Sequence, residues 1–433
     1  MRNALNVAVI GSGGREHAIV KKLRESVRVA GLYALPGNAG MKGQAELVPI
    51  RATDVAGAVR FCAENGVDFV VVTPDDPLAL GMVDALEAAG IPSFGPNKAA
   101  ARIEASKVFA KDLMKKHGIP TASYEAFDDA EDALRYVKNY FASGRDSVVV
   151  KADGLALGKG VTLCHSCKEA EDALVMTMKE KKFGDSGNRV VIEECLEGPE
   201  ASVLAFCDGK TLVPMVSSMD HKRALDGDRG PNTGGMGTIA PNPFYTSAIA
   251  GECMEKIFIP TVEAMRESGS PFKGCLYFGL MLTKDGPKTI EYNCRFGDPE
   301  TQVVLPLLEG DLLEIMLRCA DGTLDAAQVR FSKGAAACVV MASGGYPGQY
   351  ANGFAIRGID DAQKLDGITV YCAGVVEKDG ALATGGGRVL GVAAKADTLK
   401  DAVANAYKAV EKVHFENAHY RKDIGTYGLQ SLR

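Results

Sequence analysis

The chain has 433 residues, a hydrophobic share of 46% and a formal net charge of -6 at pH 7. This length exceeds what one hydrophobic core holds and predicts about three domains, while the negative charge excludes a general nucleic-acid binder, because phosphate neutralisation requires a basic surface. No apolar run reaches the ~18–20 residues that span a bilayer, so we expect no membrane association, and residues 1–10 do not have the pattern of a signal peptide.

The eleven cysteines predict a reducing, cytoplasmic environment. Their number is odd, and several lie in apolar segments such as 61–63 and 337–339, as buried thiols do and a disulfide framework does not. The one Cys-x-x-Cys pattern, at 164–167, lacks the second pair that a zinc site needs.

The chain opens with a predicted strand at 6–10, a glycine turn at 11–14 and a helix at 18–23, as in a doubly wound α/β domain. Such a turn directs free N–H groups and the positive helix end at a phosphate. It departs from a dinucleotide fingerprint, because Glu16 occupies the third glycine position and the strand near 32–35 ends without an acidic residue. We therefore favour the phosphate of another ligand over NAD, with a tight turn that binds nothing as the alternative.

The α/β alternation continues through a loop at 36–40, a helix at 55–64, a buried strand at 69–73 and a helix at 83–89. Residues 74–77 follow the strand, at the carboxyl edge where open α/β sheets bind ligands. A first domain of about a hundred residues fits this pattern.

A second glycine-rich segment, 151–161, follows predicted helices at 100–117 and 128–141 and a strand at 147–150. It is not a Walker A loop, because three residues separate Gly154 from Gly158 and Gly160 follows Lys159. A glycine flap with lysines can still fold over nucleotide phosphates, since the backbone comes close and the ammonium groups neutralise charge. An exposed hairpin turn is the alternative.

The segment 220–241 is both charged and rich in glycine, and we expect one long loop there, with neither helix nor strand ladder. Loops of this composition often bring backbone N–H groups and cations to an anionic ligand. A solvated surface loop is the other interpretation.

Two strands carry acidic residues. The strand at 189–194 ends in Glu193 and Glu194, which could equally be edge carboxylates on a solvated loop. On the strand at 289–294, which follows a strand at 275–282 and a turn at 284–287, alternation places Glu291 and Asn293 on one face. Two oxygen ligands on a rigid strand suit Mg²⁺, and the charged run 295–301 that follows favours a site over a core strand.

From about residue 334 the pattern predicts a last α+β domain, with strands at 335–341 and 389–394, turns at 344–348 and 385–388 and a helix at 398–413. We expect the segment 421–425 to dock on the body of the protein.

Taken together, the motifs resemble those of the glycinamide ribonucleotide synthetases (phosphoribosylamine–glycine ligases) of the ATP-grasp superfamily. The matching segments run in family order from residue 11 to residue 425 and read GSGGREHA, PGNAG, KADGLALGKGV, DHKR…GPNTGGMG, EYNCRFGDPETQ and RKDIG. The chain departs from the family at 73–75, where Thr-Pro-Asp replaces a common Gly-Pro-Glu, and at Tyr292, which replaces a common phenylalanine.

The resemblance implies a multidomain chain of α/β and α+β class with ATP-grasp architecture. It implies an N-terminal doubly wound parallel-sheet domain over 1–102, an ATP-grasp domain over 103–325 with a small lid subdomain at about 122–192, and a small C-terminal α+β domain over 326–433.

The implied activity is the ATP-dependent ligation of glycine to 5-phosphoribosylamine through a glycyl phosphate, in de novo purine synthesis. Its cofactors would be ATP and Mg²⁺ or Mn²⁺, and its partners only these small molecules, with no nucleic acid and no membrane. We expect a monomer or small homo-oligomer, with transient contact to the enzyme that supplies phosphoribosylamine.

The resemblance also implies site residues. Those for ATP are Lys107, Lys151, Gly158, Lys159, Gly160, Glu193, Glu194, Leu196 and Glu200. Those for the other substrates are Gly13, Gly14, Asn38, Asp220, Lys222, Asn232, Gly235, Met236, Gly237, Asp298, Pro299 and Glu300. Glu291 and Asn293 would bind the metal, and the catalytic residues would be Arg295, Asp220 and Asp298, the two aspartates being rival candidates for the glycine ammonium.

Three alternatives stay open. A related ATP-grasp ligase for another carboxylate would share the flap and the metal strand, but the segments 220–237 and 295–301 argue against it. A dehydrogenase would depend on one imperfect glycine turn. A non-catalytic ATP-binding protein would need a degraded metal strand, yet Glu291 and Asn293 are both present.

Overall fold

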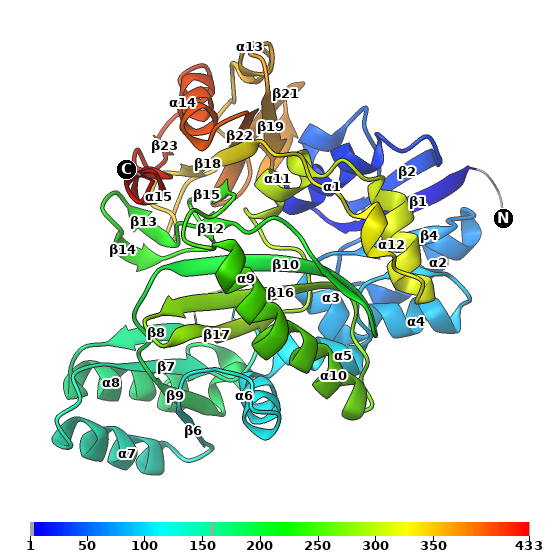
Figure 1. Ribbon diagram of the computed structural model, residues 1–433. Helices are drawn as coiled ribbons and strands as arrows, with labels where there is room; N and C mark the ends of the chain where they lie inside the picture. Colours follow the sequence, from blue (N-terminus) through cyan, green and yellow to red (C-terminus); the bar gives the residue numbers. More distant parts are fainter. Residues whose placement is uncertain (1–3, 157–159, 433) are drawn as a thin grey trace.

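The computed structural model describes residues 4–156 and 160–432 and shows a mixed α/β protein (Figure 1). The N-terminal part lies at the right in blue, the C-terminal part at the upper left in orange and red, and a small sheet with two helices projects at the lower left. Within the described ranges, no helix combines the length and apolarity needed to cross a membrane.

The N-terminal part is a five-stranded parallel sheet of order β3-β2-β1-β4-β5. Its central strands are apolar runs such as Phe69–Val72, which is buried throughout, because helices cover both faces of a parallel sheet. The elements are β1 (Leu5–Gly11), α1 (Gly14–Leu23), β2 (Val29–Pro36), β3 (Glu46–Leu47), α2 (Val55–Glu64), β4 (Phe69–Val72), α3 (Asp75–Leu80), α4 (Met82–Ala88) and β5 (Ser93–Phe94).

The single helix predicted over 100–117 is wrong. The chain forms two helices, α5 (Lys98–Ala105) and α6 (Lys107–Lys116), because Ser106 takes an extended conformation with φ -135° and ψ 112°. Its hydroxyl accepts a hydrogen bond from the Phe109 N–H at 3.1 Å and caps α6. The break places Lys107 at the first position of α6.

The middle of the chain folds into two antiparallel sheets. The smaller, of order β6-β9-β7-β8, carries two helices and contains β6 (Tyr124–Phe127), α7 (Ala130–Ala142), β7 (Val148–Ala152), β8 (Val161–Cys164), α8 (Cys167–Leu174) and β9 (Val190–Glu194). The larger, of order β11-β10-β16-β17, contains β10 (Glu200–Asp208), β11 (Leu212–Pro214), β16 (Lys273–Thr283) and β17 (Gly286–Asn293). The helices that accompany it are α9 (Ser247–Cys253), α10 (Ile259–Glu267) and α12 (Leu312–Asp321), whereas α11 (Thr301–Val304) packs against α1 and the C-terminal strands.

The long loop predicted over 220–241 is also wrong, because the segment contains short strands. Two of them, β12 (Met219–Asp220) and β15 (Gly237–Ala240), join the C-terminal sheet, where β15 pairs with β18. Between them lies a hairpin of β13 (Arg223–Leu225) and β14 (Arg229–Asn232), which turns through Gly227 at φ 68°. Glycines such as Gly227 allow the tight turns between these strands, which are only two to four residues long.

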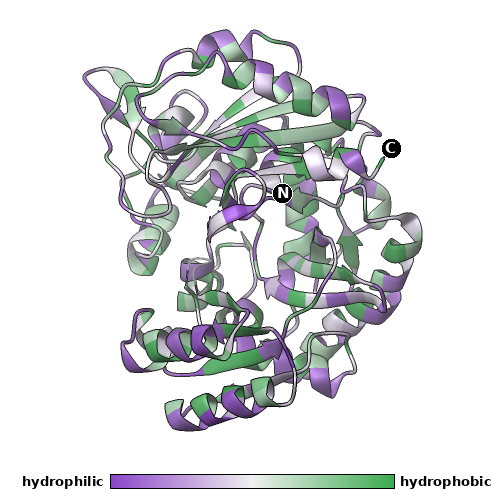
Figure 2. Cartoon of the chain, turned by 90° about the vertical axis from the view of Figure 1, so that its left-hand side faces the viewer, coloured by the Kyte–Doolittle hydropathy of each residue, from purple (hydrophilic) through white to green (hydrophobic). Residues whose placement is uncertain are grey.

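The C-terminal sheet has the order β12-β15-β18-β22-β19, with β23 beside β18. The C-terminal part of the chain supplies the strands β18 (Ala335–Ser343), β19 (Ile368–Cys372), β22 (Arg388–Ala396) and β23 (Ala418–His419) of this sheet. It also contains a separate hairpin of β20 (Val375–Lys378) and β21 (Ala381–Thr384) and the helices α13 (Ile359–Gln363), α14 (Leu399–Val410) and α15 (Thr426–Gln430). In Figure 2 the strands are mainly green and the outer helices alternate green with purple, as expected for strands in cores and helices with one solvated face.

Two buried histidines join distant parts of the fold. His17 of α1 accepts a hydrogen bond at Nδ1 from the Cys372 N–H at 2.8 Å, which ties the first sheet to the last. His221 accepts one at Nε2 from the Gly425 N–H at 3.1 Å. Burial is the main reason that the pKa falls to about 3 for His17 and about 4 for His221, so both rings are neutral when the protein is folded.

We predict that the free energy of unfolding decreases as the pH falls below 6.5, the ordinary pKa of histidine. The unfolded chain then binds protons that the folded chain does not bind until about pH 4 or 3, which costs roughly 1.4 kcal/mol per pH unit for each histidine. Chemical denaturation between pH 7.5 and 4.5 measures this slope. His17→Asn should reduce it and the same change at the exposed His165 should not; an equal slope in all three proteins would contradict the prediction.

Candidate active site

A cleft of about 1140 Å³ is lined mainly by three parts of the chain. They are the smaller antiparallel sheet β6-β9-β7-β8, here called the lid sheet, the larger antiparallel sheet β11-β10-β16-β17, here called the central sheet, and the segment 219–234. Fifteen of the predicted site residues line it: Lys107, Lys151, Gly160, Glu193, Glu194, Leu196, Glu200, Asp220, Lys222, Asn232, Glu291, Asn293, Arg295, Asp298 and Glu300. They come from four sheets, from helix α6 and from the loops between these elements, so the tertiary fold assembles the cleft from segments far apart in the chain.

On the lid side, two buried lysines share one carboxylate. Lys151 of β7 and Lys111 of α6 form ion pairs with the two oxygens of Glu193, and all three side chains are at most 4% exposed. Burial lowers the pKa of Lys111 to about 8, although Glu193 opposes the shift. Lys107 donates from Nζ to the Gly154 carbonyl at 2.9 Å, which fixes it at the start of the glycine flap.

Two further acidic residues line the cleft, Glu194 at the end of β9 and Glu200 at the start of β10. Glu194 accepts a hydrogen bond from the Ser123 N–H at 3.2 Å and lies 3.5 Å from the Lys288 ammonium. Glu200 pairs with Lys222 at 2.7 Å across the cleft. Burial alone would lower the pKa of Lys222, but Glu200 and Glu291 together raise it well above its ordinary value, so this lysine stays charged.

Glu291 and Asn293 lie on β17, as predicted, beside Gly279 and Tyr277 of β16. A Cβ at Gly279 would lie 3.0 Å from Cγ of Glu291, so the glycine leaves room for the carboxylate. Burial would raise the pKa of Glu291, but four basic side chains lower it, which keeps an anionic oxygen ligand in the cleft: Lys222, Lys151, Lys107 and Arg295. Within the described ranges, no three His, Cys, Asp or Glu side chains gather as metal ligands. The carboxylate of Glu291 and the amide oxygen of Asn293 are donors of the kind that a hard cation takes, with water and ligand oxygens as its other ligands.

Glu104 and the adjacent backbone hold Arg295 in place. Its guanidinium pairs with Glu104 at 3.1 Å and donates to the Asn293 side-chain oxygen at 3.2 Å. The second oxygen of Glu104 accepts from the Cys294 N–H at 2.7 Å. The buried Nε of Arg295 has no hydrogen-bond partner in this structure and could donate to an anion in the cleft.

Two aspartates, Asp298 and Asp220, also line the cleft, and their surroundings differ. Asp298 pairs with Arg388 at 3.2 Å and accepts from Gln302 at 2.7 Å. Burial would raise its pKa, but Arg388, Arg15, the Gln302 hydrogen bond and Arg295 together outweigh burial, and the pKa is below its ordinary value. Burial, with the nearby Glu300 carboxylate, raises the pKa of Asp220 well above its usual range. A cation between Asp220 and Glu300 would therefore be strongly attracted.

The remaining predicted residues lie outside this lining. Gly235, Met236, Gly237 and Pro299 are packed beneath it, and Gly158 and Lys159 fall outside the described residues. Gly13 and Gly14 begin α1 near Asp298, since a Cβ at Gly13 would lie 3.3 Å from that carboxylate. The Asn38 amide donates to two carbonyls, those of Ser12 at 2.8 Å and Cys372 at 2.9 Å. The substrate contacts predicted for these residues stay predictions.

The predicted site residues omit several charged residues of the cleft, among them Arg15, Glu104, Lys111 and Arg388. Lys111 could have been found, because it follows Lys107 by one helical turn and so shares its face. Arg388 gave no such signal. It comes from β22, 90 residues beyond Asp298, and only the tertiary fold brings the two together.

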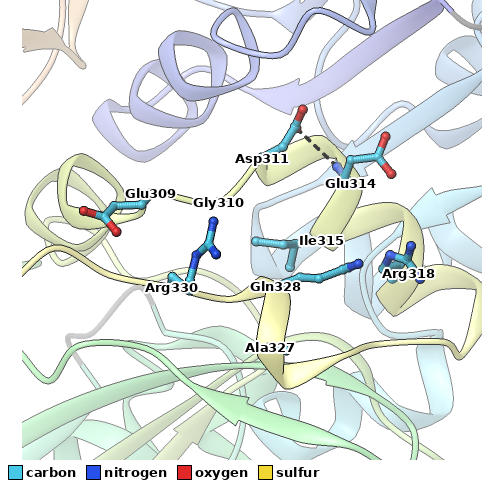
Figure 3. A pocket seen from close by; sticks show the side chains of 9 residues that line it. All are labelled: Glu309, Gly310, Asp311, Glu314, Ile315, Arg318, Ala327, Gln328 and Arg330. Carbon is cyan, nitrogen blue, oxygen red and sulfur yellow. Dashed lines mark hydrogen bonds between the residues drawn. The ribbon is translucent and has the colours of Figure 1, made fainter.

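A second cavity, of about 290 Å³, lies beside α12 and contains none of the predicted residues (Figure 3). Two of its acids contact the N-terminal part of the chain, Asp311 through the Ser26 hydroxyl at 2.7 Å and Glu314 through an ion pair with Arg28. These contacts join α12 to the loop before β2.

Comparison with known proteins places this fold and cleft in the ATP-grasp class. The model of the phosphoribosylglycinamide synthetase ATP-grasp (A) domain matches residues 105–301, and those of the N and C domains match 5–104 and 336–427. The chain belongs to the phosphoribosylglycinamide synthetase family. The predicted resemblance and fold class are confirmed.

Several relatives match over nearly the whole chain. The phosphoribosylamine–glycine ligase of Caldanaerobacter subterraneus is 47% identical over 420 residues, covering 97% of this chain and 99% of that protein. The human trifunctional purine biosynthetic protein adenosine-3 is 46% identical over 433 residues, or 99% of this chain and 42% of that protein.

Solved structures agree. The phosphoribosylamine–glycine ligase of Thermotoga maritima superposes with a TM-score of 0.84 at 35% identity, covering 97% of this chain and 100% of that one. A biotin carboxylase domain from Hydrogenobacter thermophilus gives 0.73 at 17% identity, covering 96% and 92% of the two chains, and shows a shared fold alone.

We predict that Gly235→Ala destabilises the protein by about 2–3 kcal/mol, because Gly235 has a φ of 110° that an alanine rarely adopts. The added Cβ would also lie 2.4 Å from Cδ of Pro299 and 2.7 Å from Oδ1 of Asp220. Thermal and chemical denaturation measure the effect. Gly251→Ala is the matched control, since that glycine lies in helix α9 with no atom near its added Cβ, and it should be neutral or slightly stabilising. Equal stability of the two variants would refute the steric argument.

Proposed function

We propose that this protein ligates glycine to 5-phosphoribosylamine at the expense of ATP, giving glycinamide ribonucleotide, ADP and phosphate in de novo purine synthesis. The observation that carries the proposal is the full-length match to phosphoribosylamine–glycine ligases, with 97% of this chain and 99% of the relative aligned. The cleft supplies what the reaction needs: fixed cations for phosphates, oxygen ligands for a divalent cation and buried carboxylates for an amine.

The first half of the reaction transfers the γ-phosphoryl group of ATP to a carboxylate oxygen of glycine, so that ADP leaves and glycyl phosphate forms. This transfer depends on positioning and charge neutralisation more than on covalent help from the protein. Lys107, Lys151 and Lys159 are the proposed phosphate contacts, with Gly158 and Gly160 giving the flap its close approach. Glu193, Glu194, Leu196 and Glu200 are the proposed surroundings of the adenosine.

Glu291 and Asn293 would hold Mg²⁺ or Mn²⁺, because their oxygens share one face of β17 and Glu291 is kept ionised. Such a cation would neutralise the charge of the phosphate oxygens during the transfer. The Arg295 guanidinium is the proposed stabiliser of the transferring phosphoryl group, since its planar fork fits phosphate oxygens.

Glycine would bind through its ammonium group at the carboxylate of Asp220. This carboxylate is the better candidate of the two, because it lies beside Glu300 without a paired arginine, whereas Asp298 is already paired with Arg388. Lys222, Asn232 and the packed residues Gly235, Met236 and Gly237 would form the wall behind the substrate.

In the second half, the amine nitrogen of phosphoribosylamine attacks the carbonyl carbon of glycyl phosphate. A C–N bond forms, the C–O bond to phosphate breaks, and the nitrogen gives up one proton. We propose that Gly13, Gly14 and Asn38 contact the phosphoribosyl group and that Asp298, Pro299 and Glu300 face the reacting amine. Closure of the flap would keep the mixed anhydride from water.

The wider setting is part of the same proposal. We propose that the protein works in the cytoplasm, because its eleven free cysteines suit a reducing environment. We also propose that it is a monomer or small homo-oligomer and that it contacts the enzyme that supplies phosphoribosylamine transiently. We also propose the domain boundaries 1–102, 103–325 and 326–433, with the lid at about 122–192.

One assay tests the activity: ADP release with Mg²⁺ in the presence and absence of glycine and phosphoribosylamine. We expect release only when both substrates are present, with glycinamide ribonucleotide formed in equal amount. Glycine-independent release with another carboxylate would indicate a related ATP-grasp ligase instead. NAD binding without ADP release would indicate a dehydrogenase, and ATP binding without turnover a non-catalytic protein.

We predict that Lys151→Met lowers kcat/KM for ATP by roughly 100-fold, because a buried cation at the phosphates is lost. Glu193 keeps Lys111 as a partner, so its carboxylate is not left alone in the variant. Lys138→Met, on α7 of the same lid with 63% of its side chain exposed, is the control and should retain the wild-type value. An unchanged kcat/KM for ATP in Lys151→Met would remove this lysine from the phosphate site.

A further inference from the structure

The C-terminal segment 419–425, here called the C-terminal strap, lies along the β13–β14 hairpin at the mouth of the cleft. Figure 1 shows the hairpin directly beside the red end of the chain. The strap contains the RKDIG motif, for which the proposed reaction gives no role. Arg421 and Asp423 line the cleft beside the hairpin residues Arg223, Gly227 and Asp228.

Arg421 is the centre of this contact and is only 2% exposed. Its guanidinium donates twice to Asp423, at 2.8 and 2.9 Å, and from one further nitrogen to the Arg223 carbonyl and the Asp228 carboxylate, both at 3.1 Å. An arginine has five N–H donors, and these contacts use four of them. Arg421 therefore has little capacity left for a substrate and serves to hold the protein together.

Three further hydrogen bonds join strap and hairpin. The Gly227 N–H donates to Asp423 at 2.8 Å, at the tip of the hairpin. Asp226 accepts from the Lys422 N–H at 2.7 Å, and the His419 ring lies 2.8 Å from the Ala224 carbonyl. The hairpin is thus held along both its edge and its turn.

The strap is itself fixed to the C-terminal sheet. The Tyr407 hydroxyl of α14 donates to the Arg421 carbonyl at 2.8 Å and accepts from the Ile424 N–H at 2.9 Å. At the base of the hairpin, His221 accepts from the Gly425 N–H. A continuous set of hydrogen bonds therefore connects α14, the strap and the hairpin.

The hairpin begins and ends in cleft residues. Lys222 precedes β13 and Asn232 ends β14, and the Thr233 N–H donates to the Lys222 carbonyl at 2.8 Å. Asp220 lies two residues before Lys222. We infer that Arg421 is a positioning residue, which holds the hairpin so that Asp220, Lys222 and Asn232 present a fixed wall to glycine; this rests on the proposed function. A shift of about 1 Å in such a wall is enough to cost ~100-fold in rate.

The experiment compares Arg421→Met with wild type in steady-state kinetics and in hydrogen exchange. We expect KM for glycine to rise at least tenfold while KM for ATP stays within twofold, because the ATP side is built from other elements. Arg421→Lys should recover part of the loss, since an ammonium reaches one carboxylate but cannot form the fork. Backbone amides of 223–232 should exchange faster in Arg421→Met, and those of the lid should not.

Two controls separate positioning from simple loss of folded protein. Lys422→Met removes an exposed side chain but keeps the backbone bond to Asp226, so it should behave as wild type. Asp423→Asn, a milder change, covers the case in which Arg421→Met does not fold, and should raise KM for glycine less. A fall in apparent kcat with every KM unchanged, or equal rises in KM for glycine and ATP, would overturn the inference.

The exchange measurement needs no substrate, so it remains decisive for the strap if the proposed function fails. Wild-type protein without glycine-dependent ADP release would refute the function alone. Unchanged exchange at 223–232 in both Arg421→Met and Asp423→Asn would refute the strap alone.

Discussion

Glu291 stays ionised inside the cleft because four basic side chains surround it, and the same balance of buried charge governs its neighbours. Each of these cations lowers the pKa of a carboxylate that burial alone would favour in its neutral form. Glu193 has the complementary position, one carboxylate between two lysines at most 4% exposed. The basic side chains of the cleft are therefore already in position to bind a polyphosphate, because buried carboxylates hold them there before the ligand arrives.

These buried charges balance one another only if segments that are distant in the sequence are positioned accurately. The segment 219–240 leaves the central sheet, contributes β12 and β15 to the C-terminal sheet, and returns. Through it the C-terminal sheet reaches into the cleft, as it does again through Arg388 on Asp298. The N-terminal sheet takes part through α1, whose first residues lie near the same aspartate. All three major parts of the protein thus border one aspartate.

Much of this could be predicted from local pattern. The helix Val55–Glu64 follows from periodicity with the predicted bounds. The strands predicted at 69–73 and 289–294 are found at Phe69–Val72 and Gly286–Asn293. The break at Ser106 and the strands within 219–240 could not, because a cap and a strand of two residues produce no periodic signal. The charged partners Glu104 and Arg388 were missed because charge in a sequence usually indicates a solvated face, and only tertiary contacts show that these residues are buried. The docking of the segment 421–425 was expected, and its hydrogen bonds to the hairpin confirm it.

The pairing of β15 with β18 also bears on how such a protein can be cut and recombined. A chain divided near residue 325 would leave two of the strands of one sheet on one fragment and the rest on the other. Each fragment would expose unpaired backbone N–H and C=O groups along a broken edge, a surface prone to association with other chains. The C-terminal region is therefore not an exchangeable module, and recombination of this protein with a homologue should carry residues 219–240 and 335–425 from the same parent.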